Sequence, residues 1–234
     1  MRRNLALALI VGLTATIADA QTCTLGSIIS AGTNCQTSSV LGLSKQIANE
    51  LTAMGVQFAQ ISGSRISCTG GCSGYIQKSA LTSLQSLTTS TGRTIGLSSA
   101  WRSAAQQHLL YQFKAQGKCG QTNPVATPGT SNHEGGIAID VPDYSSWKTT
   151  LTSNGWNYPL PTSDKVHFEF GTGARTYAQK NLQAFQRLWN RYNPNAKISE
   201  DGIYGPATAN AFNKAPCNGW AARLEEESTT EFLQ

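Results

Sequence analysis

Two of the three histidines in this chain lie close to carboxylates, in two short segments that combine polar and apolar residues. His133 lies seven residues before Asp140, and His167 is followed two residues later by Glu169. Two imidazoles and one carboxylate form a ligand set of catalytic zinc, which keeps its fourth position open. We therefore predict that His133, Asp140 and His167 bind one Zn²⁺ ion, provided that the two segments lie side by side.

Strand-like alternation predicts that these ligands share a face. In residues 137–141 the side chains alternate between a core face and a second face that carries Asp140. The same rule applied to residues 166–170 places His167 away from the core. The apolar residues predicted to point inward are Ile137, Ile139, Val141, Val166, Phe168 and Phe170. A pair of glycines before the first strand lets the backbone bend, so that His133 can reach the same face.

A hydrolase built on such a metal also needs a group that takes a proton from water and passes it to the leaving amine. Asp164 and Glu169 are the nearest candidates. Glu169 shares a strand face with His167, so it is also a candidate for holding that ligand in place. Asp164 precedes the strand and is free to aim its carboxylate at the water. Spacing favours Asp164 slightly and leaves both residues open.

The elements that must position these residues alternate helices with short strands. Helical periodicity predicts helices at residues 43–54, 75–89, 104–116, 147–153 and 177–192, and another that begins at Pro206. Strands are predicted at residues 94–99, 137–141 and 166–170. Because no βαβ rhythm is present, we expect an α+β fold, with a small antiparallel sheet that carries the zinc site and is flanked by helices.

The two ends of the chain differ in composition from the rest. Residues 1–20 combine two arginines, an apolar run and a small-x-small sequence, which is typical of a signal peptide. Residues 221–234 are acidic and poor in apolar side chains, so we expect a disordered tail. Between them we predict a zinc peptidase domain at 21–173 and a small helical module at 174–220. We expect residues 21–42 to form a disulfide-pinned lead-in without regular structure.

Six cysteines are present, an even number that suits three disulfides in an exported protein. A thiolate zinc cluster is the alternative, suggested by the close pair Cys68 and Cys72, but no second close pair follows. The net charge of +5 is compatible with anionic partners such as cell-wall polymers, although the basic residues are scattered. The sequence has no nucleic-acid motif, and no apolar run after the leader is long enough to span a membrane.

The motif Ser-x-His-x-x-Gly-x-Ala-x-Asp at residues 131–140, followed by Asp-x-x-His-Phe-Glu at 164–169, resembles the zinc D-Ala-D-Ala carboxypeptidases and the related L-Ala-D-Glu endopeptidases. The segment at residues 99–103, with Gln107 and the Leu-Tyr pair after it, is similar to a third element of this family. The resemblance covers about residues 75–173. It departs from the family at Ala100-Trp101 and Lys165-Val166, which bears on substrate preference.

This resemblance implies roles for individual residues. It implies that His133, Asp140 and His167 bind zinc and that Asp164 is the general acid and base, which raises Asp164 above Glu169. Arg102 matches the family arginine, and a fixed guanidinium can stabilise an oxyanion or hold a substrate carboxylate. Ser131 and Gln107 match positions that contact substrate or orient the site.

The C-terminal segment resembles a second family. Residues 182–190, and Asp-Gly-Ile-Tyr-Gly-Pro-Ala-Thr at residues 201–208, are similar to the helical peptidoglycan-binding modules that accompany wall hydrolases. The match implies either a wall-binding role or a structural cap on the catalytic domain. Both alternatives require a tight turn followed by a proline-started helix that packs on an apolar stripe.

Together these patterns predict a secreted, monomeric zinc metallopeptidase that hydrolyses stem peptides of bacterial peptidoglycan, located outside the cell or in the periplasm. The alternative is a non-catalytic zinc protein that only binds peptidoglycan. The retained ligands, Asp164 and Arg102 favour the enzyme. His108 matches no family position and is interpreted as a surface or packing residue, and Trp147 and Trp156 are interpreted as core residues.

Overall fold

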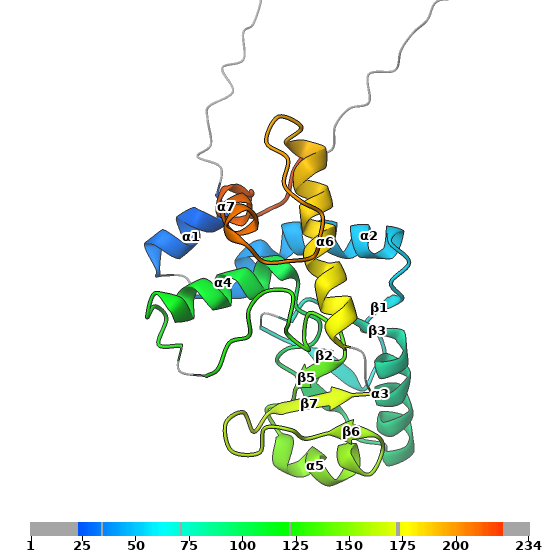
Figure 1. The fold of residues 1–234 in the computed structure, drawn as a ribbon. Helices are drawn as coiled ribbons and strands as arrows, with labels where there is room; N and C mark the ends of the chain where they lie inside the picture. The colour runs from blue at the N-terminus through cyan, green and yellow to red at the C-terminus, as the bar shows by residue number, and fades with distance from the viewer. Residues whose placement is uncertain (1–22, 34, 71, 122, 172–173, 222–234) are drawn as a thin grey trace, which may run out of the picture.

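The structure is a computed structural model that describes residues 23–33, 35–70, 72–121, 123–171 and 174–221. The predicted leader and almost all of the predicted acidic tail lie outside these residues. Helices and short strands are interspersed along the chain, and this confirms the α+β class. Figure 1 shows a helical upper part and a lower part that contains the strands. Each part has its own hydrophobic core.

Helices from both ends and from the middle of the chain build the upper part. They are α1 (Leu25–Ala31), the short 3-10 helix η1 (Thr37–Val40), α2 (Leu41–Ala53), α4 (Ala104–Ala115), α6 (Ala174–Tyr192) and α7 (Pro206–Lys214). One core cluster contains buried residues from α1, α2, α4, α6 and α7, among them Leu25, Leu43, Phe113, Phe185 and Phe212. Residues on both sides of the predicted domain boundary at residue 174 therefore contribute to the same core cluster.

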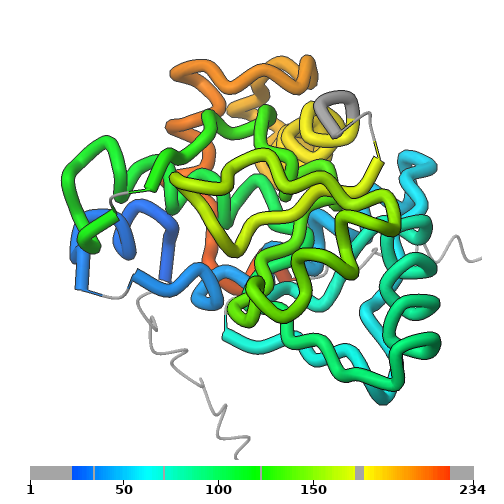
Figure 2. The backbone as a smooth tube through the Cα atoms, turned by 90° about the horizontal axis from the view of Figure 1, so that it is seen from below, coloured from blue at the N-terminus to red at the C-terminus, as the bar shows by residue number. Residues whose placement is uncertain are grey.

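The lower part contains seven short strands and two helices. They are β1 (Phe58–Gln60), β2 (Ile66–Cys68), β3 (Tyr75–Gln77), α3 (Lys78–Thr91), β4 (Ile95–Leu97), β5 (Ala138–Asp140), α5 (Tyr144–Thr152), β6 (Trp156–Asn157) and β7 (His167–Phe170). β1 pairs with β3, β2 pairs in parallel with β4, and β5, β7 and β6 form an antiparallel sheet in that order. Seen from below, residues 137–170 cross the middle of the molecule and α3 lies at one side (Figure 2).

Two predictions about the N-terminal half are wrong. The segment 21–42 is not irregular, because it contains α1, η1 and the start of α2. Thr24 and Ser27 form a capping box at the start of α1, which then buries Leu25 and two isoleucines. The helix predicted from residue 75 begins at Lys78, because residues 75–77 pair with β1 as a strand. Both features depend on partners elsewhere in the chain.

The other predicted elements are present with shifted ends. α5 begins three residues earlier than predicted, and α6 begins at Ala174. Trp147 and Trp156 are buried in the lower core, as predicted. Val166 differs from its prediction, because it precedes β7 and lines a surface cavity instead of the core.

All six cysteines form disulfides, as predicted, and no thiolate cluster exists. The pairs are Cys23–Cys217, Cys35–Cys119 and Cys68–Cys72. The first bridge joins the two ends of the described chain, where Leu25 N also donates to Ala215 O.

The turn at residues 201–204 shows why an aspartate and a glycine occupy the first two positions of its Asp-Gly-Ile-Tyr sequence. Asp201 Oδ1 accepts hydrogen bonds from Ile203 N and from Gln186 Nε2, and Gly202 N donates to Gln186 Oε1. A Cβ at Gly202 would lie 2.7 Å from the Gln179 carbonyl oxygen, so only glycine fits against α6 there. These residues dock the turn onto α6.

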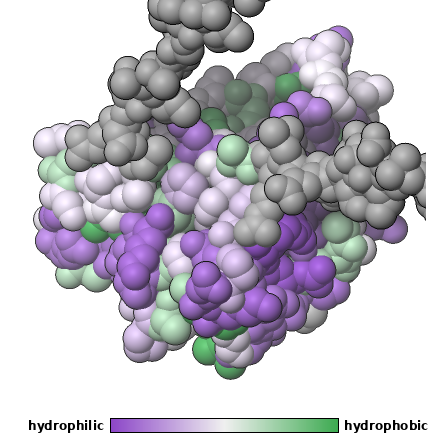
Figure 3. Space-filling view, turned by 90° about the horizontal axis from the view of Figure 1, so that it is seen from above, coloured by the Kyte–Doolittle hydropathy of each residue, from purple (hydrophilic) through white to green (hydrophobic). Residues whose placement is uncertain are grey.

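Across the described residues, no helix is long and apolar enough to cross a membrane. Polar residues dominate the described part of the face in Figure 3, where apolar residues form small separate groups.

Candidate active site

The sheet brings two of the predicted metal ligands into direct register. β5 and β7 are antiparallel neighbours, and Asp140 is the register partner of His167. Ile139 and Phe168, also paired, are fully buried in the lower core. Because alternate side chains of a strand point to opposite faces, Asp140 and His167 lie together on the other face. The predicted pairing of these two segments is confirmed.

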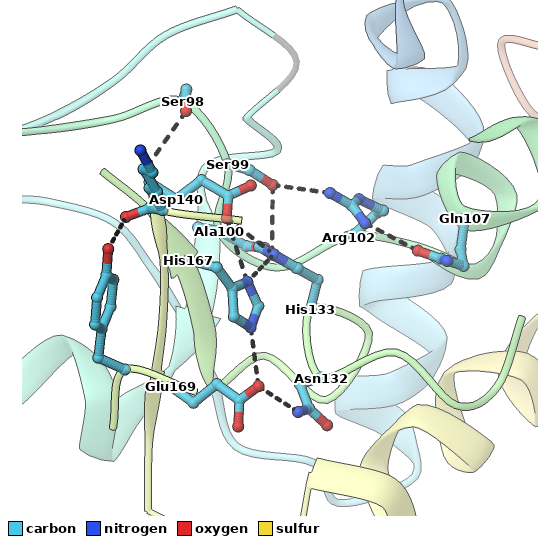
Figure 4. A network of polar contacts seen from close by, with 12 residues as sticks. Ser98, Ser99, Ala100, Arg102, Gln107, Asn132, His133, Asp140, His167 and Glu169 are labelled. Carbon is cyan, nitrogen blue, oxygen red and sulfur yellow. Dashed lines mark hydrogen bonds and ion pairs between the residues drawn. The ribbon is translucent and has the colours of Figure 1, made fainter. Parts of the chain in front are cut away.

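His133 reaches the same point from the loop before β5. Its carbonyl oxygen accepts a hydrogen bond from Gly136 N, which closes a tight turn, and Gly136 adopts a left-handed φ of 70°. A Cβ at Gly136 would lie 2.3 Å from the Phe58 ring, so the close approach also requires glycine. This turn directs the His133 imidazole toward His167 (Figure 4).

Three ligand atoms form a nearly regular triangle. His133 Nε2 lies 3.1 Å from His167 Nδ1, and each of these atoms lies 3.3 Å from Asp140 Oδ1. Tetrahedral zinc with bonds of about 2.0–2.2 Å separates its ligand atoms by roughly 3.3–3.6 Å. The group His133, Asp140 and His167 can therefore hold a metal ion with little rearrangement.

The remaining nitrogen of each imidazole has a partner outside this triangle. His133 Nδ1 lies 2.8 Å from the carbonyl oxygen of Ala100, and His167 Nε2 lies 2.9 Å from Glu169 Oε1. The same Glu169 oxygen accepts a hydrogen bond from Asn132 Nδ2 at 2.6 Å. Such outer contacts fix the tautomer and orientation of metal-binding histidines. Glu169 is thus engaged on the far side of His167.

The ionisable groups at the site shift one another's pKa values. Burial raises the pKa of Asp140, but the charge and hydrogen bonds of the two histidines outweigh it and hold the pKa well below its usual range. Burial lowers the pKa of His167, but hydrogen bonds to Asp140 and Glu169 outweigh it and raise the pKa to about 9. Without a metal, the site therefore keeps a proton on His167 at neutral pH.

Asp164 lies in the loop between β6 and β7. Its backbone N–H donates to Leu160 O, and its carbonyl oxygen accepts from His167 N, so the loop is tied to the start of β7. Burial, together with the negative charge of Asp140, raises the pKa of the half-buried Asp164 carboxyl group. The pKa of Asp164 therefore moves toward the range that suits proton transfer.

Arg102 lies just before α4, beside the histidines. Its Nη1 donates to Gln107 Oε1 at 3.0 Å, and its Nη2 lies 3.5 Å from Ser99 Oγ (Figure 4). Gln107 in turn donates from Nε2 to Ala126 O at 2.6 Å. Gln107 is fully buried, so the guanidinium is held from one side by a fixed amide.

A cavity of about 460 Å³ collects the residues predicted from the sequence. All seven site residues line it, and Glu169 lines it as well. The seven are Arg102, Gln107, Ser131, His133, Asp140, Asp164 and His167. The separated motifs of the sequence therefore converge on one place.

Two further polar residues of the site were missed by sequence analysis. Glu134 is fully buried, and its carboxylate oxygens accept hydrogen bonds from the backbone N–H groups of Gly129 and Ser131. Burial raises the pKa of Glu134 to about 8, although these hydrogen bonds oppose the shift. Asn181 of α6 donates to the carbonyl oxygens of Arg102 and Glu134. The sequence did contain a signal for each residue: Glu134 is an acidic residue next to His133, and Asn181 is an asparagine within an apolar helical stripe.

Comparison with protein families matches residues 75–193 to VanY, D-alanyl-D-alanine carboxypeptidase. The chain belongs to this family. The match begins at β3 and ends just after α6, so it contains every element that carries the metal triad. Peptidases of this family depend on a metal ion, and family membership supports a hydrolase that acts on peptidoglycan. Comparisons with curated proteins and with solved structures gave no match.

Proposed function

We propose that this chain is a secreted zinc metallopeptidase that hydrolyses a peptide bond in the stem peptides of peptidoglycan. The bond is either the terminal D-Ala-D-Ala bond or an internal bond such as L-Ala-D-Glu. One observation carries the proposal: the triangle of His133, Asp140 and His167 opens into a cavity that also contains Asp164 and Arg102. Family membership supplies the substrate class.

The donor set favours zinc over harder cations. Two imidazole nitrogens and one carboxylate oxygen suit Zn²⁺, whereas Mg²⁺ and Ca²⁺ prefer sites made of oxygen ligands. In this proposal His133, Asp140 and His167 hold the ion, and Ala100 O and Glu169 orient the two imidazoles. When bound, Zn²⁺ polarises the scissile carbonyl and lowers the pKa of water toward neutrality.

Asp164 is proposed as the general base and acid. It lies on the cavity wall, and burial and the charge of Asp140 raise its pKa toward the working range. In this role it accepts a proton from the attacking water and delivers it to the leaving amine. Glu169 is a weaker candidate, because its Oε1 already contacts His167 and Asn132.

Arg102 is proposed to stabilise the negative charge that develops on the scissile carbonyl oxygen. Its guanidinium is restrained by Gln107 and Ser99, so little reorganisation is needed as charge develops. Gln107 acts here through Arg102, since its amide oxygen accepts from the guanidinium and its amide nitrogen donates to Ala126 O. Ser131 is a candidate for direct substrate contact, because it lines the cavity.

Hydrolysis of defined muropeptides tests the proposal. Zinc-loaded protein should release D-Ala or split an internal bond, with products identified by mass spectrometry, and a chelator should stop the reaction. An absence of any product from fully zinc-loaded protein would contradict the proposal.

The alternative is a non-catalytic zinc protein that binds peptidoglycan, and an Asp164→Ala variant separates the two. For an enzyme, hydrolysis should fall by roughly 10²–10⁴-fold while zinc content and wall binding persist. A non-catalytic binding protein would show no hydrolysis in either the wild type or the variant.

The setting of the enzyme is part of the same proposal. Three disulfides suit an oxidising environment, which agrees with export through the predicted leader. We also propose that the protein is a monomer in solution. We further propose that residues 174–220 bind the cell wall. Pull-down with insoluble peptidoglycan, using the Asp164→Ala variant to prevent digestion, measures that binding.

A further inference from the structure

We infer that a separate pocket beside Trp101 binds an N-acetylated sugar of the glycan strand, next to the site that cuts the stem peptide. This inference takes its substrate from the proposed function and adds a second contact to that substrate. Three observations carry it: a buried indole N–H without a partner, the chemistry of the pocket lining, and a wall shared with the candidate active site.

Trp101 has a hydrogen-bond donor that the rest of the protein leaves unused. Among the described residues, Trp101 Nε1 is the only buried side-chain nitrogen or oxygen without a hydrogen-bond partner. Buried polar groups of native proteins almost always have a partner, and an indole N–H can only donate. The ring packs against Phe58 and Tyr75, at centroid distances of 5.3 and 6.0 Å, so it is fixed in place. An acceptor must therefore come to Trp101 through a pocket that it lines.

One such pocket, called here the Trp101 pocket, lies away from the metal ligands. It has a volume of about 240 Å³ and lies between α2 and the paired strands β1 and β3. Leu41 and Lys45 of α2, Gln60 of β1 and Tyr75 of β3 line it together with Trp101. Pockets for drug-sized ligands measure roughly 300–1,000 Å³, so this smaller pocket suits a single sugar ring.

The lining of the Trp101 pocket matches the parts of an N-acetylated sugar. Leu41 is 37% exposed and offers an apolar surface to the acetamido methyl group. The half-buried ring of Tyr75 can pack against the C–H groups of a sugar. Lys45 and Gln60 are exposed and have no side-chain partner among the described residues, so both can bond to hydroxyl groups.

The acetamido group supplies the acceptor that the indole lacks. Its carbonyl oxygen can accept from Trp101 Nε1 while its methyl group contacts apolar surface. Trp101 is only 1% exposed, so a slim group of this kind reaches the N–H more easily than a bulky one. None of the described residues that line the pocket carries a carboxylate. The pocket therefore favours a neutral, N-acetylated sugar.

Trp101 also connects this pocket to the candidate active site. It lines a second cavity of about 400 Å³, which reaches Asp140 and Arg102. Its backbone N–H donates to Tyr75 O at 3.0 Å, and its carbonyl oxygen accepts from Ser73 Oγ, so the shared wall is anchored to the Trp101 pocket. A sugar in this pocket and a peptide at the metal triad would thus lie on either side of one wall.

The covalent structure of peptidoglycan requires this proximity. The stem peptide is attached to N-acetylmuramic acid, and about one to four residues separate that sugar from the two candidate bonds. An extended residue spans at most about 3.6 Å, so the sugar stays within roughly 15 Å of the bond that is cut. The sequence departs from the family at Ala100-Trp101, so we infer that the sugar contact is a feature of this chain.

The disaccharide of N-acetylglucosamine and N-acetylmuramic acid, without peptide, is the first probe. The chain has five tryptophans, and the indole signal of Trp101 in a ¹H–¹⁵N spectrum is the one that Trp101→Phe removes. Triple-resonance spectra of the wild type give the same assignment if this buried variant does not fold. We expect the Trp101 signal to shift with the disaccharide and to stay in place with its de-N-acetylated form. No shift, or equal shifts with both sugars, would overturn the inference.

A substitution at the exposed rim of the pocket provides the second test. Lys45→Ala removes one charged donor, and we expect the Kd for the disaccharide to rise by about tenfold. Lys78→Ala is the matched control, because Lys78 is an exposed lysine at the start of α3, outside the Trp101 pocket. Equal affinities of the two variants would contradict the inference.

Kinetics separate this inference from the proposed function. Zinc-loaded wild type should cut a stem peptide that carries the disaccharide with a kcat/KM about tenfold higher than the same peptide without it. Lys45→Ala should reduce this preference and leave the rate on the bare peptide unchanged. If neither peptide is cut, the proposed function fails, and the disaccharide titration still decides whether the sugar site exists. If both are cut equally well, the proposed function stands and the inference is lost.

Discussion

Glu169 and His167 lie two residues apart on β7, and Glu169 Oε1 contacts the imidazole nitrogen that faces away from the metal triad. This contact leaves Nδ1 of His167 directed at Asp140 Oδ1, 3.3 Å away. One carboxylate on the strand thus fixes which nitrogen of its neighbour is available to a metal ion.

Removal of this carboxylate should weaken metal binding. We expect Glu169→Ala to lower zinc affinity by about 10–100-fold, because the imidazole loses its orienting partner. Glu169→Gln should have a smaller effect, since its amide oxygen can still accept a hydrogen bond. Competition with a chromophoric chelator measures both. Asp143→Ala is the control at a surface carboxylate whose partner is Ser146, and equal affinities of the Ala variants would contradict the prediction.

Metal binding should strengthen as the pH rises. Hydrogen bonds to Asp140 and Glu169 raise the pKa of His167 to about 9 against the effect of burial, so a metal must displace a proton at neutral pH. Between pH 6 and 9, affinity should increase by about tenfold per pH unit for one displaced proton. The metal-free protein should show the opposite trend, because a raised pKa contributes stability below pH 6.5 that is lost as the pH approaches 9. A zinc affinity independent of pH would contradict this account.

His108 should make the protein sensitive to acid. It is buried between α4 and α7, where its ring nitrogens lie 2.7 Å from Tyr204 Oη and 3.0 Å from Asn213 Oδ1. Burial lowers the pKa of His108 to about 4, although the contact with Asn213 opposes the shift. The unfolded chain therefore binds the proton more readily, and stability present above pH 6.5 is lost as the pH falls toward 4.

The expected loss of unfolding free energy is roughly 2–3 kcal/mol between pH 7 and 4.5. Urea unfolding at the two pH values measures it, with His108→Gln as a reference that cannot titrate. Wild type should lose more stability than the variant on acidification. Parallel losses in the two proteins would assign the acid sensitivity to other groups.

Gln107 should affect catalysis through Arg102. Loss of its amide in Gln107→Ala releases one side of the guanidinium, and we expect kcat/KM to fall by roughly 10–100-fold at unchanged zinc content. Gln116→Ala is the control, because Gln116 caps the other end of α4 and its amide contacts Gln112. An effect on zinc content instead of kcat/KM would show that Gln107 supports the metal site.

The C-terminal helices should not fold in isolation. Buried residues of α6 and α7, including Leu182, Phe185 and Phe212, pack in the cluster shared with α1, α2 and α4, and Cys217 is bonded to Cys23. A peptide of residues 174–220 would expose this apolar surface to water. We expect circular dichroism and NMR spectra of an unfolded chain. A folded peptide that binds peptidoglycan would establish an independent module.

Much of the site was predictable because its signals are local. Alternation in residues 137–141 and 166–170 placed Asp140 and His167 on one face, and the sheet pairs these two residues directly. The start of α1 was missed because Thr24 and Ser27, which cap it, lie in a segment rich in serine, threonine and glycine. Such residues occur equally in loops, so only burial of the apolar face decides between helix and loop.

The remaining differences depend on contacts between distant segments. Residues 75–77 have helical neighbours, but pairing with β1 makes them a strand. Val166 follows the alternation of its neighbours in sequence, yet it precedes β7 and faces the cavity. The role of Asn181 could not be predicted, because its hydrogen-bond partners Arg102 and Glu134 lie far from it in the sequence. The Glu134 carboxylate accepts from Gly129 and Ser131, which are close in sequence, but its complete burial depends on the fold.

The Cys23–Cys217 bridge, which spans 194 positions of sequence, closes almost the whole described chain into a covalent ring. A protease that cuts any single loop between these cysteines leaves its two fragments joined, and the packed helices can keep both in place. The nicked molecule would migrate as two pieces only after reduction. In the presence of proteases, this chain can therefore be cut once and still keep both halves of its site together.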